Sequence, residues 1–213
     1  MIIQFRARRT WVVWCLSFAM LCFSEKAWSA SFRFVRWVDD GDTIVLSDGT
    51  RLRYIGVNAP EIKHKDMPAE RFGHKSKAFN RDLVYHKKVH LELGRQQHDH
   101  YGRLLAYVFL EDGTFVNDKL VRSGYAYYLF REPNTKHNRL LLIAQREAMA
   151  KRVGLWKEFQ DKIGHYIGNK RSKRFHRTTC RFGKATAKRN RISFDKRYAA
   201  FWAGYSPCKK CRP

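Results

Sequence analysis

RYIGVNAPE, at residues 53–61, is the stretch of this sequence on which both the fold and the chemistry depend. Its apolar residues around Tyr54 predict a short strand, and Pro60 ends that strand because proline has no backbone N–H to donate to a sheet. Arg53 opens the stretch and Glu61 follows the proline. In a chain with 43 Lys and Arg against 19 Asp and Glu, a carboxylate behind a restricted backbone is a candidate functional acid.

Outward from this stretch, the first part of the chain predicts short strands joined by tight turns. Ser47-Asp48-Gly49 and Glu111-Asp112-Gly113 lie between apolar runs, as is typical of hairpins. The predicted strands are 32–38, 43–46, 51–57, 88–93 and 103–110. The predicted helices are 69–86, a short one capped by Asn117 and ending at Gly124, and 138–152. Several strands with few helices outside them favour an α+β fold on a small closed barrel.

Three loops beside these strands carry carboxylates and arginines. Asp40-Gly41-Asp42 precedes one strand, the 53–61 stretch ends another, and Asp99-His100-Tyr101-Gly102-Arg103 precedes a third. Taken singly, each has a simpler explanation, because the first is a common turn sequence and Arg103 fits a solvated strand residue. Taken together, they bring acids and guanidinium groups from three loops to one barrel.

The joint pattern resembles the thermonuclease, or staphylococcal nuclease-like, family over about residues 34–157. Three separated motifs agree with it in order and spacing, and two later ones fit its helices. These motifs are VDDGDTI (38–44), RxxxxNAPE (53–61), DHYGRxLA (99–106), GYA (124–126) and GLW (154–156). The resemblance implies an OB-fold, a five-stranded β-barrel with about three helices, and calcium-dependent hydrolysis of DNA or RNA.

The resemblance also implies a calcium site built from oxygen ligands, which hard cations prefer. Its ligands are the Asp42 carboxylate, the Asn58 side chain and the backbone carbonyl of Ala59, with Asp40 as an acceptor behind them. The family has a second aspartate where this chain has Asn58. An amide oxygen still binds calcium but adds no charge, so this site carries one negative charge fewer.

Three catalytic residues follow from the same resemblance. Glu61 orients or deprotonates the attacking water, and Pro60 restricts the backbone just before it. Arg53 and Arg103 clamp the phosphate, because a guanidinium donates two hydrogen bonds at once and keeps its charge. Tyr101 contacts a phosphate oxygen or stacks on a base of the substrate. The alternative for Tyr101 is a buried place in the barrel wall.

Residues 160–213 differ in amino-acid composition from the rest of the chain. They carry sixteen Lys and Arg against two Asp, a net charge of +14. A segment this polar builds little apolar core of its own and needs a cross-link, such as a bound metal or a disulfide, to stabilise it. The pairs His176-x3-Cys180 and Cys208-x2-Cys211 are typical of a structural zinc site with four protein ligands. The alternative is a Cys208–Cys211 disulfide that leaves Cys180 free.

The residues around these four ligands resemble the zinc-binding module of Ada-type DNA alkylation-repair proteins, over about residues 166–212. The matching patterns are Asn169-x2-Ser172-x3-His176-x3-Cys180 and Gly204-Tyr205-Ser206-Pro207-Cys208-x2-Cys211. In that family, a cysteine at the position of His176 accepts the methyl group. Histidine there implies a purely structural zinc. The basic module is expected to hold phosphates without reading sequence; the alternative is a solvated basic surface.

The N-terminal residues 1–29 predict a secretory signal peptide. Arginines at positions 6, 8 and 9 precede the apolar run at 11–23, which is too short for an ordinary membrane span. An uncleaved N-terminal anchor is the alternative. Removal of the segment leaves a net charge of about +21, which attracts polyanions. We expect an exported protein, periplasmic or extracellular, with no stable membrane association after cleavage.

The sequence thus predicts three parts: the signal peptide 1–29, a nuclease domain at 30–159 and a zinc-binding domain at 160–213. The predicted function is a secreted, calcium-dependent nuclease acting on DNA and/or RNA, assisted by its basic zinc module. One alternative is a non-catalytic nucleic-acid-binding protein on the same barrel. A second is an adhesin for acidic polysaccharide or membrane, which leaves the acids and arginines of the barrel loops unexplained. The oligomeric state does not follow from the sequence.

Overall fold

A computed structural model describes residues 32–62 and 68–213 of the 213-residue chain. The predicted signal peptide, residues 1–29, lies outside the described residues. Within the described part, no helix is long and apolar enough to cross a membrane.

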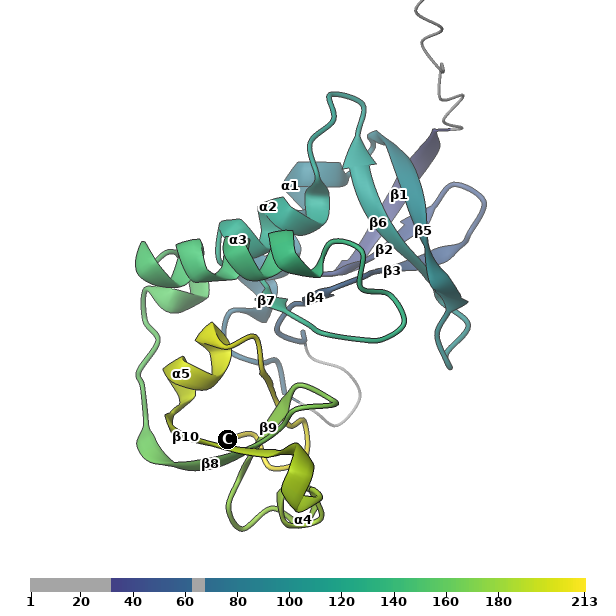
Figure 1. The fold of residues 1–213 in the computed structure, drawn as a ribbon. Coiled ribbons are helices and arrows are strands. Elements are labelled where there is room, and N and C mark those ends of the chain that lie inside the picture. Colours follow the sequence, from purple (N-terminus) through teal and green to yellow (C-terminus); the bar gives the residue numbers. More distant parts are fainter. Residues whose placement is uncertain (1–31, 63–67) are drawn as a thin grey trace, which may run out of the picture.

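The first predicted domain is built on a closed five-stranded barrel with the strand order β1-β2-β3-β6-β5 (Figure 1). Neighbouring strands run antiparallel, except that β3 and β6 pair in parallel. Inward-facing apolar side chains alternate along the strands and fill the barrel, among them Val35, Ile44, Leu52 and Val108. The strands are β1 (Arg33–Asp40), β2 (Thr43–Leu46), β3 (Arg51–Tyr54), β5 (Lys88–His98) and β6 (Leu104–Leu110). The predicted five-stranded barrel is confirmed.

Three α-helices and a small second sheet complete this domain (Figure 1). The helices are α1 (Gly73–Val84), α2 (Val116–Arg122) and α3 (Asn138–Ala150), followed by the 3-10 helix η1 (Gly154–Trp156). The two-stranded sheet pairs β4 (Val57–Asn58) with β7 (Tyr127–Tyr128). This pairing fixes the backbone just before Ala59–Glu61, which is the segment that carries the predicted catalytic acid.

The C-terminal module contains a four-stranded sheet with the order β10-β8-β9-β11. Two short α-helices and a 3-10 helix lie in the connections between its strands. Its elements are β8 (Ile163–Asn169), β9 (Arg174–Arg177), α4 (Arg181–Lys184), η2 (Lys188–Asn190), β10 (Arg191–Lys196), α5 (Arg197–Trp202) and β11 (Ser206–Pro207).

The module shares one apolar core with the end of the nuclease domain. Met149 of α3 and Trp156 of η1 are buried in the same cluster as Phe175 and Phe201 of the module. Gln145 of α3 is buried between the two parts, and its side chain donates to the carbonyl of Phe201 at 2.7 Å and accepts from the N–H of Tyr128 at 2.8 Å. The module is poor in apolar residues, as its sequence indicates, because part of its core comes from the preceding domain.

Candidate active site and metal centre

The turn between β1 and β2 places Asp42 at the base of the site. Gly41 lies so close to the 58–61 segment that a Cβ there would come within 2.5 Å of the Cβ of Ala59. A glycine at this position therefore lets the two loops meet. The N–H of Ala59 donates to Asp42 Oδ2 at 2.6 Å across that contact.

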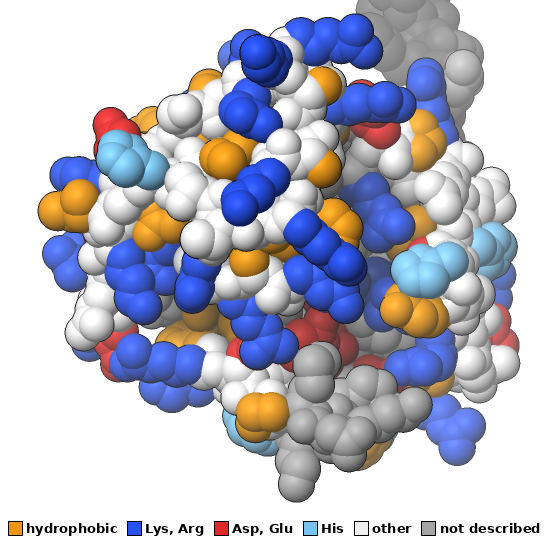
Figure 2. Space-filling model, turned by 90° about the horizontal axis from the view of Figure 1, so that it is seen from below, with side chains coloured by type: hydrophobic (Ala, Val, Ile, Leu, Met, Phe, Trp, Pro, Cys, Tyr) orange, Lys and Arg blue, Asp and Glu red, His pale blue; other side chains and the backbone are white. Residues whose placement is uncertain are grey.

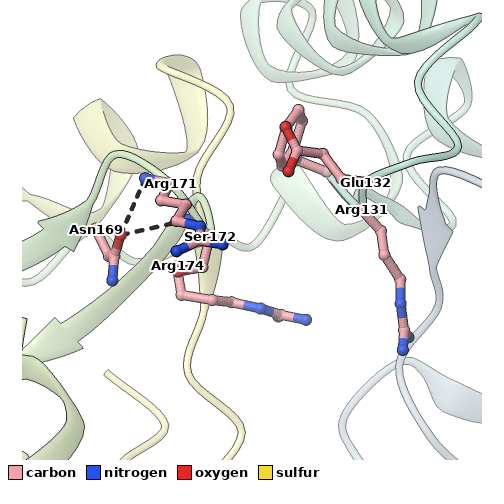
Figure 3. Close-up of a pocket in the computed structure, with 7 residues that line it drawn as sticks. Arg131, Glu132, Asn169, Arg171, Ser172 and Arg174 are labelled. Atoms are coloured by element: carbon pink, nitrogen blue, oxygen red, sulfur yellow. Dashed lines mark hydrogen bonds between the residues drawn. The ribbon is translucent and has the colours of Figure 1, made fainter. Parts of the chain in front are cut away.

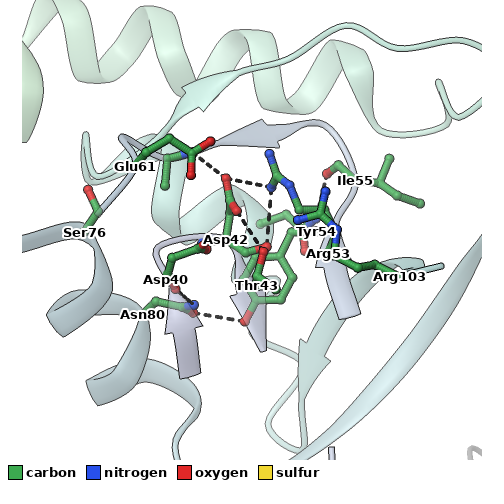
Figure 4. A network of polar contacts seen from close by, with 12 residues as sticks. Asp40, Asp42, Thr43, Arg53, Tyr54, Ile55, Glu61, Ser76, Asn80 and Arg103 are labelled. Atoms are coloured by element: carbon green, nitrogen blue, oxygen red, sulfur yellow. Dashed lines mark hydrogen bonds and ion pairs between the residues drawn. The ribbon is translucent and has the colours of Figure 1, made fainter. Parts of the chain in front are cut away.

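Asp42 is buried and forms an ion pair with Arg53, which lies opposite Thr43 in the β2–β3 ladder. Arg53 Nη1 is 2.6 Å from Asp42 Oδ2 (Figure 4). Burial raises the pKa of Asp42 to about 8, because desolvation outweighs the lowering by Arg53 and the nearby Asp40 raises the pKa further. One guanidinium partner therefore does not fully offset the cost of burying the ionised Asp42 carboxylate.

Two of the other predicted calcium-site residues, Asp40 and Ala59, contact Asp42. Asp40 Oδ1 accepts the N–H of Asp42 at 2.9 Å and so braces the turn. Asn58 is partly buried at the end of β4. Ala59 contacts Asp42 through its N–H, and the predicted ligand role of its carbonyl stays a prediction. Carboxylate, amide and carbonyl oxygens around a buried, charge-deficient acid fit a hard cation such as calcium.

Arg103 is held by Asp99, a residue of the 99–103 motif to which sequence reasoning gave no role. Arg103 donates through Nε to Asp99 Oδ2 at 2.9 Å, and its Nη2 lies 2.7 Å from the same oxygen. The other carboxylate oxygen accepts the N–H groups of Tyr101 and Arg103. Desolvation opposes ionisation of Asp99, but these hydrogen bonds hold its pKa below the usual value. The sequence signal that could have identified Asp99 is its place at the start of a turn, where an Asp side chain often accepts the N–H of the residue two positions later.

Tyr101 projects from this turn with 73% of its surface exposed, so the barrel-wall alternative is wrong. The Arg103 guanidinium carbon lies 5.3 Å from the centre of the Tyr101 ring. An exposed ring beside a phosphate-binding candidate is available to a base or a phosphate oxygen, and its role in substrate binding stays a prediction.

Arg53 of β3 and Arg103, which directly precedes the neighbouring strand β6, line the same cavity of about 40 Å³. Arg131, from the loop between β7 and α3, lines it as well. No sequence motif indicates Arg131, because this residue lies 78 residues beyond Arg53 and outside the motifs. The structure therefore brings together both predicted phosphate ligands and adds a third arginine.

Glu61 is partly exposed at the rim of this group, two residues after Ala59. Pro60 before it is buried, and the Glu61 N–H donates to Glu70 Oε2 at 3.2 Å. Figure 4 draws Glu61 with its carboxylate toward the Asp42–Arg53 pair. Its Oε1 also lies 3.2 Å from Nζ of Lys209, a residue of the C-terminal module. The module thus reaches the predicted catalytic acid, which the sequence did not indicate.

The four predicted zinc ligands meet in the module. The ligand atoms of His176, Cys180, Cys208 and Cys211 all lie within 4.8 Å of one another, and three of these residues are buried. Cys180 Sγ is 3.6 Å from His176 Nδ1. In a tetrahedral zinc site, sulfur and nitrogen ligands lie about 3.5 Å apart, so this geometry fits the metal. No disulfide joins the cysteines of the described chain.

The ligands come from two segments held side by side by the pairing of β9 with β11. His176 lies on β9 and Cys180 is the N-cap residue of α4, while Cys208 follows β11 directly. Desolvation raises the pKa of the Cys180 thiol, but hydrogen bonds from the N–H groups of Gly183 and Phe182 favour the thiolate. The pKa is therefore lowered. Burial raises the pKa of Cys211 to about 11. A bound cation would offset this penalty, because zinc binds the deprotonated thiolate.

Comparison with known families matches both parts of the chain. Residues 158–213 match the family described as the metal binding domain of Ada. Residues 51–158 match the staphylococcal nuclease homologue family.

Similar individual proteins are thermonucleases and endonucleases. The chain is 40% identical to a thermonuclease of Staphylococcus intermedius over 125 residues, which cover 57% of this chain and 74% of that protein. It is 36% identical to a thermonuclease of Staphylococcus hyicus, covering 59% and 75%. It is 35% identical to the endonuclease YncB of Bacillus subtilis, covering 55% and 57%. With the barrel, the motifs and these matches in agreement, the chain belongs to the staphylococcal nuclease homologue family.

Proposed function

We propose that this chain is an exported, calcium-dependent nuclease that hydrolyses phosphodiester bonds of DNA and/or RNA. One observation carries the proposal: Arg53 and Arg103 line one cavity, and Arg53 pairs with the buried Asp42, toward which the Glu61 carboxylate points (Figure 4). Two guanidinium groups in one small cavity suit the oxygens of a single phosphate. The names of the thermonuclease and endonuclease relatives support the same reaction class.

In this reaction, Glu61 takes a proton from a water molecule as the water oxygen bonds to phosphorus. The bond between phosphorus and the leaving oxygen breaks, and solvent returns a proton to that oxygen. Arg53 and Arg103 stabilise the negative charge that grows on the phosphate oxygens. Their carboxylate partners, Asp42 and Asp99, keep each guanidinium oriented before the substrate arrives.

Asp42, Asn58 and the carbonyl of Ala59 would hold calcium, with Asp40 bracing Asp42 from behind. When bound, the cation supplies a positive charge beside the phosphate and lowers the pKa of water. Burial raises the pKa of Asp42 despite the nearby Arg53, and a cation at this place would offset that cost of burying the ionised carboxylate.

His176, Cys180, Cys208 and Cys211 would hold a structural zinc ion, since four protein ligands leave no open position for chemistry. Metal analysis of protein purified without chelators should give one zinc per chain. Cys208→Ser should lose the metal and unfold the module at lower temperature. A protein that contains no zinc and forms a Cys208–Cys211 disulfide would contradict this part of the proposal.

The nuclease proposal is tested with plasmid DNA and with RNA, in calcium, in magnesium and in zinc alone. Cleavage should require calcium, and Glu61→Gln or Arg103→Ala should lose at least ~100-fold in rate. Glu111→Gln, an exposed acid paired with Lys88 at 3.9 Å, is the matched control and should cut normally. Retarded migration of DNA without cutting, under all three metals, would instead support the non-catalytic binder.

Export is proposed from the N-terminal sequence, which lies outside the described residues. Fractionation of the producing cells should recover the protein in the periplasm or medium, shortened by about 29 residues at its N-terminus. Full-length protein retained with the membrane fraction would support the uncleaved anchor.

A further inference from the structure

A cleft of about 410 Å³ separates the nuclease domain from the C-terminal module. The loop after β7 forms one wall with Arg131 and Glu132, and the β8–β9 turn forms the other with Arg171 and Arg174. Figure 3 shows the Arg174 side chain extending from the module into the space, and Arg131 on the opposite wall. Three guanidinium groups thus face one opening against a single carboxylate.

These arginines lack acidic partners within the described residues. Glu132 forms no ion pair with any of the three, and Arg174 donates instead to the carbonyl of Pro207 at 3.1 Å. Arg174 is half-buried, and it shares the lining of the cleft with Arg131 and Arg171. Like charges that converge on a partly buried space are stabilised by an anion between them.

The cleft is continuous with the proposed nuclease site through Arg131. This residue lines both the cleft and the small cavity that Arg53 and Arg103 share. Arg131 thus connects the arginines of the proposed nuclease site with those of the cleft. A series of cations of this kind can neutralise successive phosphates of a nucleic acid strand.

The size and lining of the cleft favour a single strand over a duplex. A volume of 410 Å³ lies in the range of small-ligand sites, about 300–1,000 Å³, and is far too small for a double helix. Phe130 contributes an aromatic ring to the lining. A basic groove with an aromatic side chain is the usual combination for single-stranded nucleic acid. Figure 2 shows Lys and Arg side chains over much of the surrounding face.

We propose that this cleft binds the single nucleic acid strand that leaves the nuclease site, with its phosphates held by Arg131, Arg171 and Arg174. The inference rests on the proposed nuclease function for the direction of the strand, and on the arginine cleft itself for binding. The module would thus complete the substrate site in addition to attracting polyanions.

The test compares two double variants that each remove two positive charges from the module. Arg171→Ala/Arg174→Ala empties one wall of the cleft, whereas Lys188→Ala/Arg189→Ala changes the exposed η2 segment. Binding of a labelled single-stranded DNA of about 20 nucleotides is followed by fluorescence anisotropy in calcium-free buffer over a salt series. Thermal unfolding and zinc content report whether each variant is folded. If a variant that carries Arg174→Ala does not fold, Arg171→Ala alone, which changes an exposed side chain, replaces the double variant.

The cleft variant should bind the single strand at least about tenfold more weakly, and its salt slope should fall by about 1.4. The control and a duplex of the same sequence should change less than about twofold. Equal losses in both double variants, or an equal loss for duplex, would overturn the proposal. Hydrolysis of a dinucleotide, too short to reach the β8–β9 turn, should be unchanged in the cleft variant. If the unaltered protein cuts no substrate, the nuclease proposal is refuted. The binding measurements would still test whether the cleft binds a single strand.

Discussion

Asp42 is a buried carboxylate with a guanidinium 2.6 Å away and a pKa of about 8. Burial favours the protonated form of this carboxyl in the metal-free protein and so raises its pKa above that of an exposed aspartate, whereas Arg53 favours the ionised form of the pair. The carboxyl thus contributes to stability most fully at low pH, and this contribution is lost as the pH rises toward 8. A cation that needs the ionised form must displace this proton.

Calcium affinity should therefore rise with pH and level off above about 8. Between pH 6 and 8, the apparent dissociation constant should fall about tenfold per pH unit, because one proton leaves for each ion bound. Isothermal titration in buffers of different ionisation enthalpy measures both the affinity and the proton. Asp42→Asn should abolish the proton release. An affinity that stays constant from pH 6 to 8 would contradict the assignment of Asp42.

Asp99 is predicted to position Arg103. Asp99→Asn leaves the turn hydrogen bonds possible but removes the charge that orients the guanidinium, so kcat/KM should fall about tenfold to a hundredfold. Asp48→Asn, which alters an exposed acid paired with Arg33 at 3.0 Å, is the control. Addition of guanidinium to the Arg103→Ala variant should restore part of its activity, and the same addition should not help Asp99→Asn. Unchanged kinetics for Asp99→Asn would refute the role.

Among the elements, sequence patterns predicted the barrel well and the helix boundaries less well. The helix predicted at 69–86 is Gly73–Val84. Phe72 has a φ of 77° and packs at a tilt against Tyr125 with ring centres 5.4 Å apart, so a tertiary contact accompanies its place outside the helical region. No local pattern reports such a contact, because phenylalanine rarely adopts this conformation.

Asn117 illustrates the same limit for polar residues. The sequence predicts a helix cap, but α2 begins earlier, at Val116, and Asn117 is buried within it. Its side chain accepts from the N–H of Val108 at 2.9 Å and donates to the carbonyl of Ile55 at 2.8 Å. These partners lie on distant segments, so local capping preferences could not distinguish a cap from a buried link between strands.

Asn117→Ala should consequently destabilise the nuclease domain. Two buried backbone groups would lose their partners, at a cost of about 1–3 kcal/mol each. Chemical denaturation measures the change in the free energy of unfolding, with Gln97→Ala on an exposed strand position as the control. A loss below about 0.5 kcal/mol would contradict a stabilising role for the hydrogen bonds of Asn117.

At the scale of the molecule, the two family matches meet near residue 158, but the folded units do not separate there. Trp156 and Met149 are buried against Phe201 and Phe175 of the module. The motifs located the acids, arginines and zinc ligands within each part. They could not reveal Arg131 or the contacts of Lys209, since these depend on how the two parts pack together.

A chain truncated after residue 159 should be less stable than the full chain, because Trp156 and Met149 would lose their apolar cover. We expect the nuclease domain to lose at least about 2 kcal/mol and its melting temperature to fall. Differential scanning calorimetry and the red shift of tryptophan fluorescence report the two effects. Phe201→Ala in the full chain should show a smaller change in the same direction. An unaltered melting temperature after truncation would show that the parts fold independently.

Lys209 stands between Cys208 and Cys211, and its ammonium group lies 3.2 Å from Glu61. Any event that changes the spacing of those two sulfur atoms also moves a positive charge at the acid that would activate water. Oxidation of the thiols, or capture of their metal by a stronger chelator, would therefore register as a change in turnover. The hydrolytic rate of this enzyme would then record the redox and metal status of its surroundings.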